Sequence, residues 1–190
     1  ITSTLGTISI DAETGTLTMD GTANVEATGS SARLNAALDV TLGNVTATNV
    51  SIVSGEDIVN AASSTKNVTA TNLRLAAVGS IGTSARHITT NIDTISASAN
   101  TGSIYITEDN AATVNDVTVT VNVVSSDATA AGTITDAAQS DLATSTNGNI
   151  VLVATLGDIT LNDGSDTDSI SVTANGTGNI LINALAGSIT

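Results

Sequence analysis

Apolar and polar residues alternate in short runs along the chain. In Thr101–Ile106 and Gly148–Val153, a glycine is followed two and four positions later by an apolar residue. Residues two apart in a strand lie on the same face, so this alternation predicts short β-strands with one buried face. Similar runs occur at Leu5–Ile10, Thr14–Met19, Ala131–Thr135, Gly157–Leu161, Asp168–Val172 and Gly178–Ile182.

Two longer repeats indicate how these strands are arranged. The hexapeptide NVTATN occupies Asn44–Asn49 and returns at Asn67–Asn72, 23 positions later (67 − 44 = 23). Asn149–Thr160 and Asn179–Thr190 share six of twelve residues at an offset of 30 (179 − 149 = 30), which spans three strand units. A sandwich of hairpins has no reason to repeat at this interval. A parallel β-helix does, because equivalent residues of successive coils stack ~4.8 Å apart.

The fold class predicted from this pattern is all-β, specifically a parallel β-helix (solenoid). Dividing 190 residues by the two offsets gives roughly seven coils of 23–30 residues, with about three short strands each. We expect one β-helix domain over residues 1–190, as a segment of a longer chain or as a fibre subunit. Differences in coil length are expected in loops such as Asp127–Asp141, because the strands must keep their register.

Asparagines at repeated turn positions predict a structural ladder. An asparagine tolerates left-handed backbone and can hydrogen-bond its equivalent in the next coil. We expect Asn44 and Asn67 to lie one strand spacing apart, with Val45 over Val68 in the core. The residues predicted to form the ladder are Asn44, Asn67, Asn149 and Asn179.

Composition narrows the possible partners. The formal net charge is −14, with only four Lys and Arg residues, which disfavours nucleic acid and anionic membrane surfaces as partners. No apolar run reaches the ~20 residues that span a bilayer, so no membrane insertion is expected. Cysteine is absent, which excludes disulfides and thiolate metal sites, and Tyr105 is the one aromatic residue.

Candidate chemistry is sparse. Asp163, Asp166 and Asp168 could offer oxygens to Ca²⁺, but this stretch lacks the twelve-residue loop ending in glutamate, so an acidic turn is the simpler interpretation. No other cofactor is expected. His87 has no second histidine or cysteine with which to share a metal. No catalytic residues are predicted. A polysaccharide-cleaving site would need clustered carboxylates beside an arginine, which Arg33, Arg74 and Arg86 could supply.

Val78–Val114 resembles repeats of filamentous-haemagglutinin-like exoproteins of bacteria, in which G-x-I-G-[ST] is followed by a strand and then by G-x-I-Y-[IL]. The matching residues are Gly79, Ile81, Gly82, Thr83, Gly102, Ile104, Tyr105 and Ile106. The resemblance implies a right-handed coil, export, and an extracellular or bacterial cell-surface location. It also implies a role in adhesion or fibre building, and it brings no catalytic residues.

The expected function is therefore an extracellular structural β-helix that serves as a stalk, fibre segment or adhesin module. Its expected partners are a second copy joined end to end, or more of the same chain, and a cell-surface glycan or receptor. Two alternatives are a carbohydrate-active β-helix, which binds or cleaves polysaccharide, and a calcium-dependent adhesive module.

Overall fold

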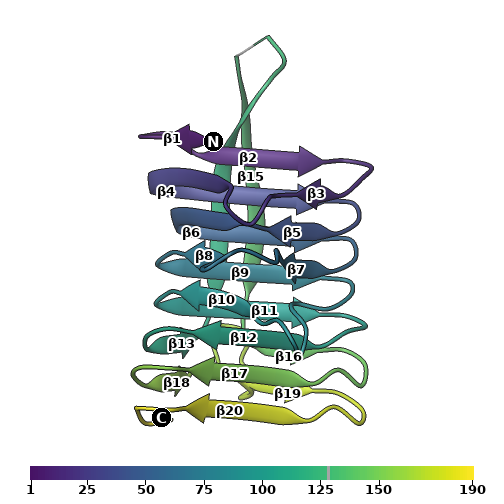
Figure 1. Cartoon of the computed structure of the whole chain (residues 1–190), viewed down its shortest axis with the longest axis vertical. Helices are drawn as coiled ribbons and strands as arrows, with labels where there is room; N and C mark the ends of the chain where they lie inside the picture. Colours follow the sequence, from purple (N-terminus) through teal and green to yellow (C-terminus); the bar gives the residue numbers. More distant parts are fainter. Residues whose placement is uncertain (128) are drawn as a thin grey trace.

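The computed structural model describes residues 1–127 and 129–190 and is built from strands, with no helix among the described residues. The chain winds into stacked coils whose strands lie across the long axis (Figure 1). Most strands belong to one parallel, 15-stranded sheet that turns 309° around an axis. The all-β class and a solenoid-like arrangement of parallel strands are thereby confirmed.

The first face is formed by strands that pair in succession from one end of the stack to the other. The register runs through Ile10, Leu34, Ile52, Leu75, Ala97, Leu142 and Val172. The strands are β2 (Ile8–Ala12), β4 (Asn24–Ala36), β6 (Asn44–Ser54), β9 (Asn72–Ala77), β11 (Thr94–Ala99), β16 (Leu142–Thr144) and β19 (Val172–Ala174).

A second series of strands carries another column of inward side chains. Its members are β3 (Leu17–Thr18), β5 (Val40–Leu42), β7 (Ile58–Asn60), β12 (Ile104–Glu108), β17 (Ile150–Ala154) and β20 (Ile180–Ala184). The inward column is Leu17, Val40, Ile58, Ile81, Ile104, Ile150 and Ile180. From Val40 to Ile150 these side chains are fully buried, whereas Ile180 at the end of the stack is 48% exposed. The core is therefore a stack of aliphatic columns, which explains why it needs no aromatic side chains.

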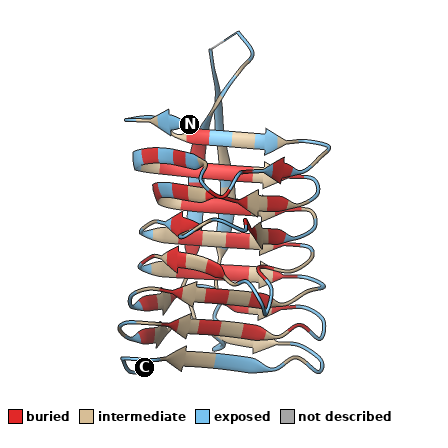
Figure 2. Cartoon of the chain, viewed as in Figure 1, coloured by how far each residue is buried: buried red, intermediate tan, exposed pale blue. Residues whose placement is uncertain are grey.

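Shorter strands complete the coils: β1 (Thr2–Ser3), β8 (Val68–Thr69), β10 (Ile88–Asn91), β13 (Ala112–Val114) and β18 (Ile159–Leu161). Val45 pairs with Val68, so the two copies of NVTATN lie in register on neighbouring coils. Figure 2 shows buried residues concentrated in the middle coils and exposed ones at β2 and β20. Equivalent residues of successive coils are separated by 23 or 30 positions in the sequence, as the repeats indicated, but in other coils by 18 or 46 positions.

The 46-residue spacing contains a β-hairpin that the sequence did not reveal. The segment Asp127–Asp141, expected to be a loop, contains β15 (Ala130–Gln139), which pairs antiparallel with β14 (Val117–Val124). The hairpin runs along the long axis, across the coils (Figure 1). Alternate side chains Val117, Val119 and Val121 are buried. The strand expected at Ala131–Thr135 is present within β15, but the remainder of the segment was wrongly expected to be a loop, because it continues the pairing with β14. Most of β15 is exposed, and β14 is the hairpin strand that packs on the first face.

One recurring turn holds the coils in register. A residue with a polar side chain precedes the inward apolar residue, and its side-chain oxygen accepts a hydrogen bond from the backbone N–H of its equivalent in the next coil. Asp57 Oδ1 accepts from Ser80 N at 2.6 Å, and Ser103 Oγ accepts from Asn149 N at 3.0 Å. We call this series the turn ladder; its members are Asp39, Asp57, Ser80, Ser103, Asn149 and Asn179.

Glycines beside the turn ladder allow the backbones of neighbouring coils to approach. A Cβ on Gly148 would lie 1.9 Å from the carbonyl oxygen of Gly102, and one on Gly178 would lie 2.1 Å from that of Gly148. No real Cβ fits at such distances. The glycine of the G-x-I pattern is therefore required by the close contact between neighbouring coils.

Gly148→Ala should therefore destabilise the fold by about 2–4 kcal/mol, because the added methyl group pushes two coils apart. The matched control is Gly15→Ala, where the new Cβ meets nothing within 4 Å. This control should change stability by less than about 1 kcal/mol. Urea unfolding of both variants measures the difference, and equal effects would contradict the stacked-turn arrangement.

Candidate functional site

The hairpin is fastened to the first face by two arginines. Arg33 Nε on β4 donates to both carboxylate oxygens of Asp136 on β15, at 3.1 and 3.0 Å, and Arg33 Nη1 lies 3.4 Å from Asp11 Oδ2. The Arg33 and Asp136 side chains are only 10% and 11% exposed. Arg74 Nε on β9 donates to the carbonyl oxygen of Ala137. These arginines therefore lie beneath the hairpin, where their hydrogen bonds hold β15.

Arg86, the third arginine considered for polysaccharide chemistry, donates from Nη1 to the carbonyl oxygen of Asn60. A shallow groove of about 390 Å³ lies elsewhere and is lined mainly by hydroxyl, amide and small side chains. Its two acidic residues are Glu26 and Asp93, and no arginine is among the described residues that line it. A second pocket is lined by Asp11, the exposed partner of Arg33, and by Glu13, but Arg33 itself is held beneath the hairpin.

His87 and Glu108 also have partners within the fold. His87 Nδ1 lies 2.8 Å from Thr107 Oγ1, its ring contacts Tyr105, and burial lowers its pKa. Glu108 is fully buried and accepts hydrogen bonds from the Thr90 hydroxyl and from two backbone N–H groups. Burial raises the pKa of Glu108 despite these bonds. Both residues therefore serve as polar links between coils.

Of the four asparagines predicted to form a ladder, one pair is hydrogen-bonded to each other and the other pair is not. Asn179 Nδ2 donates to Asn149 Oδ1 at 3.2 Å, and both residues belong to the turn ladder. Asn44 Nδ2 instead donates to Asn24 Oδ1. Asn67 is fully buried and donates inward to the carbonyl oxygens of Leu42 and Gly43. Asn44 and Asn67 thus lie on neighbouring coils, but their side chains point to different partners.

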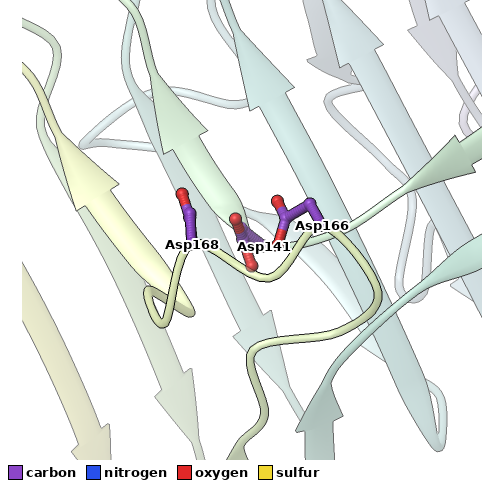
Figure 3. Close-up of side chains that lie close together, drawn as sticks. All are labelled: Asp141, Asp166 and Asp168. Carbon is purple, nitrogen blue, oxygen red and sulfur yellow. The ribbon is translucent and has the colours of Figure 1, made fainter.

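The acidic segment yields the most concentrated group of charges. Asp166 and Asp168 lie on the loop between β18 and β19, and Asp141 lies between β15 and β16 (Figure 3). One carboxylate oxygen from each of the three lies within 4.8 Å of the other two. We call these three residues the aspartate triad. Asp163 is not a member; its Oδ1 accepts from the N–H of Ile170 at 2.9 Å.

Asp141 has an unusual environment within the triad. The residue is only 6% exposed, and its Oδ1 is buried without a hydrogen-bond partner. Burial raises its pKa to about 7, and the negative charges of Asp166 and Asp168, a side-chain hydrogen bond with Asp166 and the charge of Asp163 add to the effect. Its φ of 68° places the backbone in the left-handed region, where an aspartate is tolerated. The fold therefore holds a carboxyl group where ionisation is costly.

The triad lies at the base of the hairpin. Asp141 follows β15 directly after Ser140, whose hydroxyl donates to Asp166 Oδ2 at 2.8 Å. Asp116 directly precedes β14, and its Oδ1 is likewise buried without a partner, close to Gly164 of the acidic loop. Asp116 and Asp141 could not be identified from the sequence, because no motif spacing connects them to a loop that begins 22 or more residues further along the chain (163 − 141 = 22).

The arrangement can offer oxygen ligands to a hard cation. The triad supplies carboxylates from two segments, and none of the ion pairs among the described residues, which involve Arg33 and Lys66, includes a triad member. Carboxylates of this kind suit Ca²⁺ better than a soft metal.

Comparisons with known proteins find no match, whether the chain is compared with protein-family models, with curated proteins or with solved structures. Among the described residues, no helix has the length and apolar character needed to cross a membrane.

Replacing Arg33 tests how the hairpin is fastened. Arg33→Ala should cost about 3–5 kcal/mol, because it leaves the buried Asp136 carboxylate without its partner. The control Asp11→Asn removes the more exposed partner of the same arginine and should cost less than about 1 kcal/mol. Chemical unfolding measures both, and similar costs would contradict a buried attachment of β15.

The raised pKa of Asp141 predicts a pH dependence in chelator-treated protein. The unfolded chain ionises Asp141 near pH 3.8 and the folded protein near 7, so the folded state binds more protons between these values. Stability is then fully present below pH 3.8 and falls as pH rises, until the loss is complete above about pH 7. Asp141→Asn should abolish this loss and be more stable than wild type at pH 8 by an amount on the order of 2–4 kcal/mol.

The control for this pH series is Glu13→Gln, which removes one exposed negative charge directly after β2. β2 lies near one end of the stack, and β18 and β19 lie near the other (Figure 1). Urea unfolding at pH 4 and pH 8 should show the same pH dependence in this control as in wild type. A wild-type pH dependence that persists in Asp141→Asn would show that other groups cause it.

Proposed function

We propose that this chain is an extracellular structural element, a stalk, fibre segment or adhesin module of a bacterial surface protein, which works without catalysis. The observation that carries the proposal is the continuous stacking of aliphatic columns and of the turn ladder through successive coils. Such a stack transmits force along its axis through backbone hydrogen bonds, and its length grows with the number of coils.

The number of coils and their right-handed winding are part of the same proposal. The described pairing is consistent with roughly seven coils, and crossovers between parallel strands are right-handed in ~98% of cases. The similarity of Val78–Val114 to filamentous-haemagglutinin-like repeats supports the same hand. In that segment Ile81 and Ile104 pair across coils, and Gly82 has a φ of 69° that favours glycine. The two G-x-I sequences that carry the resemblance therefore lie at the turn ladder, where one coil stacks on the next.

The end of the stack at β20 supports the proposed partners. Ile180 continues the inward column and is 48% exposed, and Leu181 beside it is 49% exposed. The outer edge of a parallel strand also offers unpaired backbone groups to another strand. We propose that further β-helix covers this end, from the same chain or from a second copy joined end to end. The acidic outer surface is free to meet a cell-surface glycan or receptor.

Electron microscopy of the native material tests the proposal. Rods or fibres with strands perpendicular to the long axis are expected, with a ~4.8 Å axial repeat in diffraction. Compact particles confined to the cell interior would contradict it.

Sedimentation of the isolated chain tests the end contact. Ile180→Lys places a charge at the end of the column and should reduce concentration-dependent association. Val124→Lys replaces an apolar residue that is 65% exposed on the hairpin and should leave association unchanged. Identical behaviour of the two variants would count against end-to-end joining.

A further inference from the structure

The base of the hairpin carries charges that the fold itself does not neutralise. The aspartate triad brings three carboxylates together, and none of them takes part in the ion pairs of the described residues. An acidic cluster alone is common on protein surfaces. Here a second observation points to a ligand, because Asp141 is 94% buried (100 − 6 = 94) and its Oδ1 lacks a hydrogen-bond partner. Figure 3 shows this side chain between those of Asp166 and Asp168.

A buried carboxylate oxygen without a donor is costly, and proteins normally pair such a group or use it to bind a metal. The other triad members keep oxygens available. Asp166 accepts the Ser140 hydroxyl through Oδ2, and Asp168 accepts the N–H of Ile170 through Oδ1. Each therefore has one carboxylate oxygen outside these two hydrogen bonds.

We propose that the aspartate triad binds one Ca²⁺ ion, which joins the base of the hairpin to the acidic loop between β18 and β19. Ca²⁺ lies 2.3–2.6 Å from its oxygen ligands, so two ligands on opposite sides of the ion are up to roughly 5 Å apart. The spread of 4.8 Å among the triad oxygens fits this sphere. Water and backbone carbonyl oxygens complete the six to eight ligands that Ca²⁺ takes.

The position of the ion gives it a mechanical effect. Asp141 leads from β15 into β16 on the first face, whereas Asp166 and Asp168 belong to the acidic loop further along the chain. The two segments already meet through the Ser140–Asp166 hydrogen bond and through the pairing of β16 with β19. One ion would add a stronger link between them, at the same end of β15 that the arginines hold through Asp136 and Ala137. The site extends the sequence-based suggestion of Asp163, Asp166 and Asp168, since it replaces Asp163 with the buried Asp141. The proposal does not depend on the stalk function.

Thermal unfolding of the chelator-treated full chain, titrated with CaCl₂, tests the site. We expect a dissociation constant of ~10⁻⁴–10⁻³ M, the range of extracellular calcium modules. At free calcium of ten to a hundred times that value, the melting temperature should rise by roughly 3–8 °C. MgCl₂ at the same concentration should give a smaller rise, because Mg²⁺ demands ligands at 2.0–2.1 Å. NaCl at matched ionic strength corrects for screening.

Variants assign the effect to the triad. Asp141→Asn and Asp168→Asn should each lose most of the calcium-dependent rise, whereas Glu13→Gln should keep it. Isothermal titration should give one site in wild type and in Glu13→Gln. Absence of a calcium-dependent rise in wild type, or an equal rise in Asp141→Asn, would overturn the proposal.

Hydrogen exchange of wild type provides a measurement that does not depend on how the variants fold. Calcium should slow amide exchange at Ser140–Asp141 and at Asp163–Ile170, and leave β2 and β3 unchanged. Slowing that is spread evenly over the chain, or absent from the acidic loop, would contradict a site at the base of the hairpin.

Discussion

The close stacking of one turn on the next is the constraint on which the remaining structure depends. At this turn a glycine lets two backbones approach, and the following polar side chain accepts an N–H from the neighbouring coil. The next residue then points inward at a fixed height, so Ile58, Ile81 and Ile104 fall into one column. Because side chains alternate along a strand, a slip of one residue would turn these isoleucines outward. The turn thus fixes the register of neighbouring strands, and this register aligns the inward side chains that form the core.

The hairpin and the acidic loop are additions to this regular stack. The hairpin accounts for pairing intervals of 46 and 47 positions (159 − 112 = 47), and the acidic loop lies within the following interval of 30. β14 and β15 cross the first face along the axis, and a solenoid that is otherwise held by contacts between neighbouring coils thereby gains contacts that span several of them. Arg33 and Arg74 hold the C-terminal half of β15 through Asp136 and Ala137, and the aspartate triad lies just beyond, at the base of the hairpin. The hairpin is therefore joined to the stack through charged side chains.

The sequence predicted those parts of the fold that repeat. The two copies of NVTATN align because Val45 and Val68 occupy equivalent core positions, and the 30-residue repeat aligns because Ile150 and Ile180 do. The hairpin could not be predicted, since its alternating valines are typical of any strand and give no indication of an antiparallel partner. Asp141 could not be predicted as part of a site for a similar reason. Its proximity to Asp166 and Asp168 arises from stacking of coils, which no local motif encodes.

Nuclear Overhauser contacts between backbone protons of stacked residues test the central claim most directly. A uniformly labelled sample should show parallel-strand contacts that link Ile58 with Ile81, Ile81 with Ile104, and Ile104 with Ile150 across the hairpin insertion. Such a series requires the stacked-turn register described here. Contacts in an antiparallel pattern between these isoleucines, or their absence in a folded sample, would contradict it.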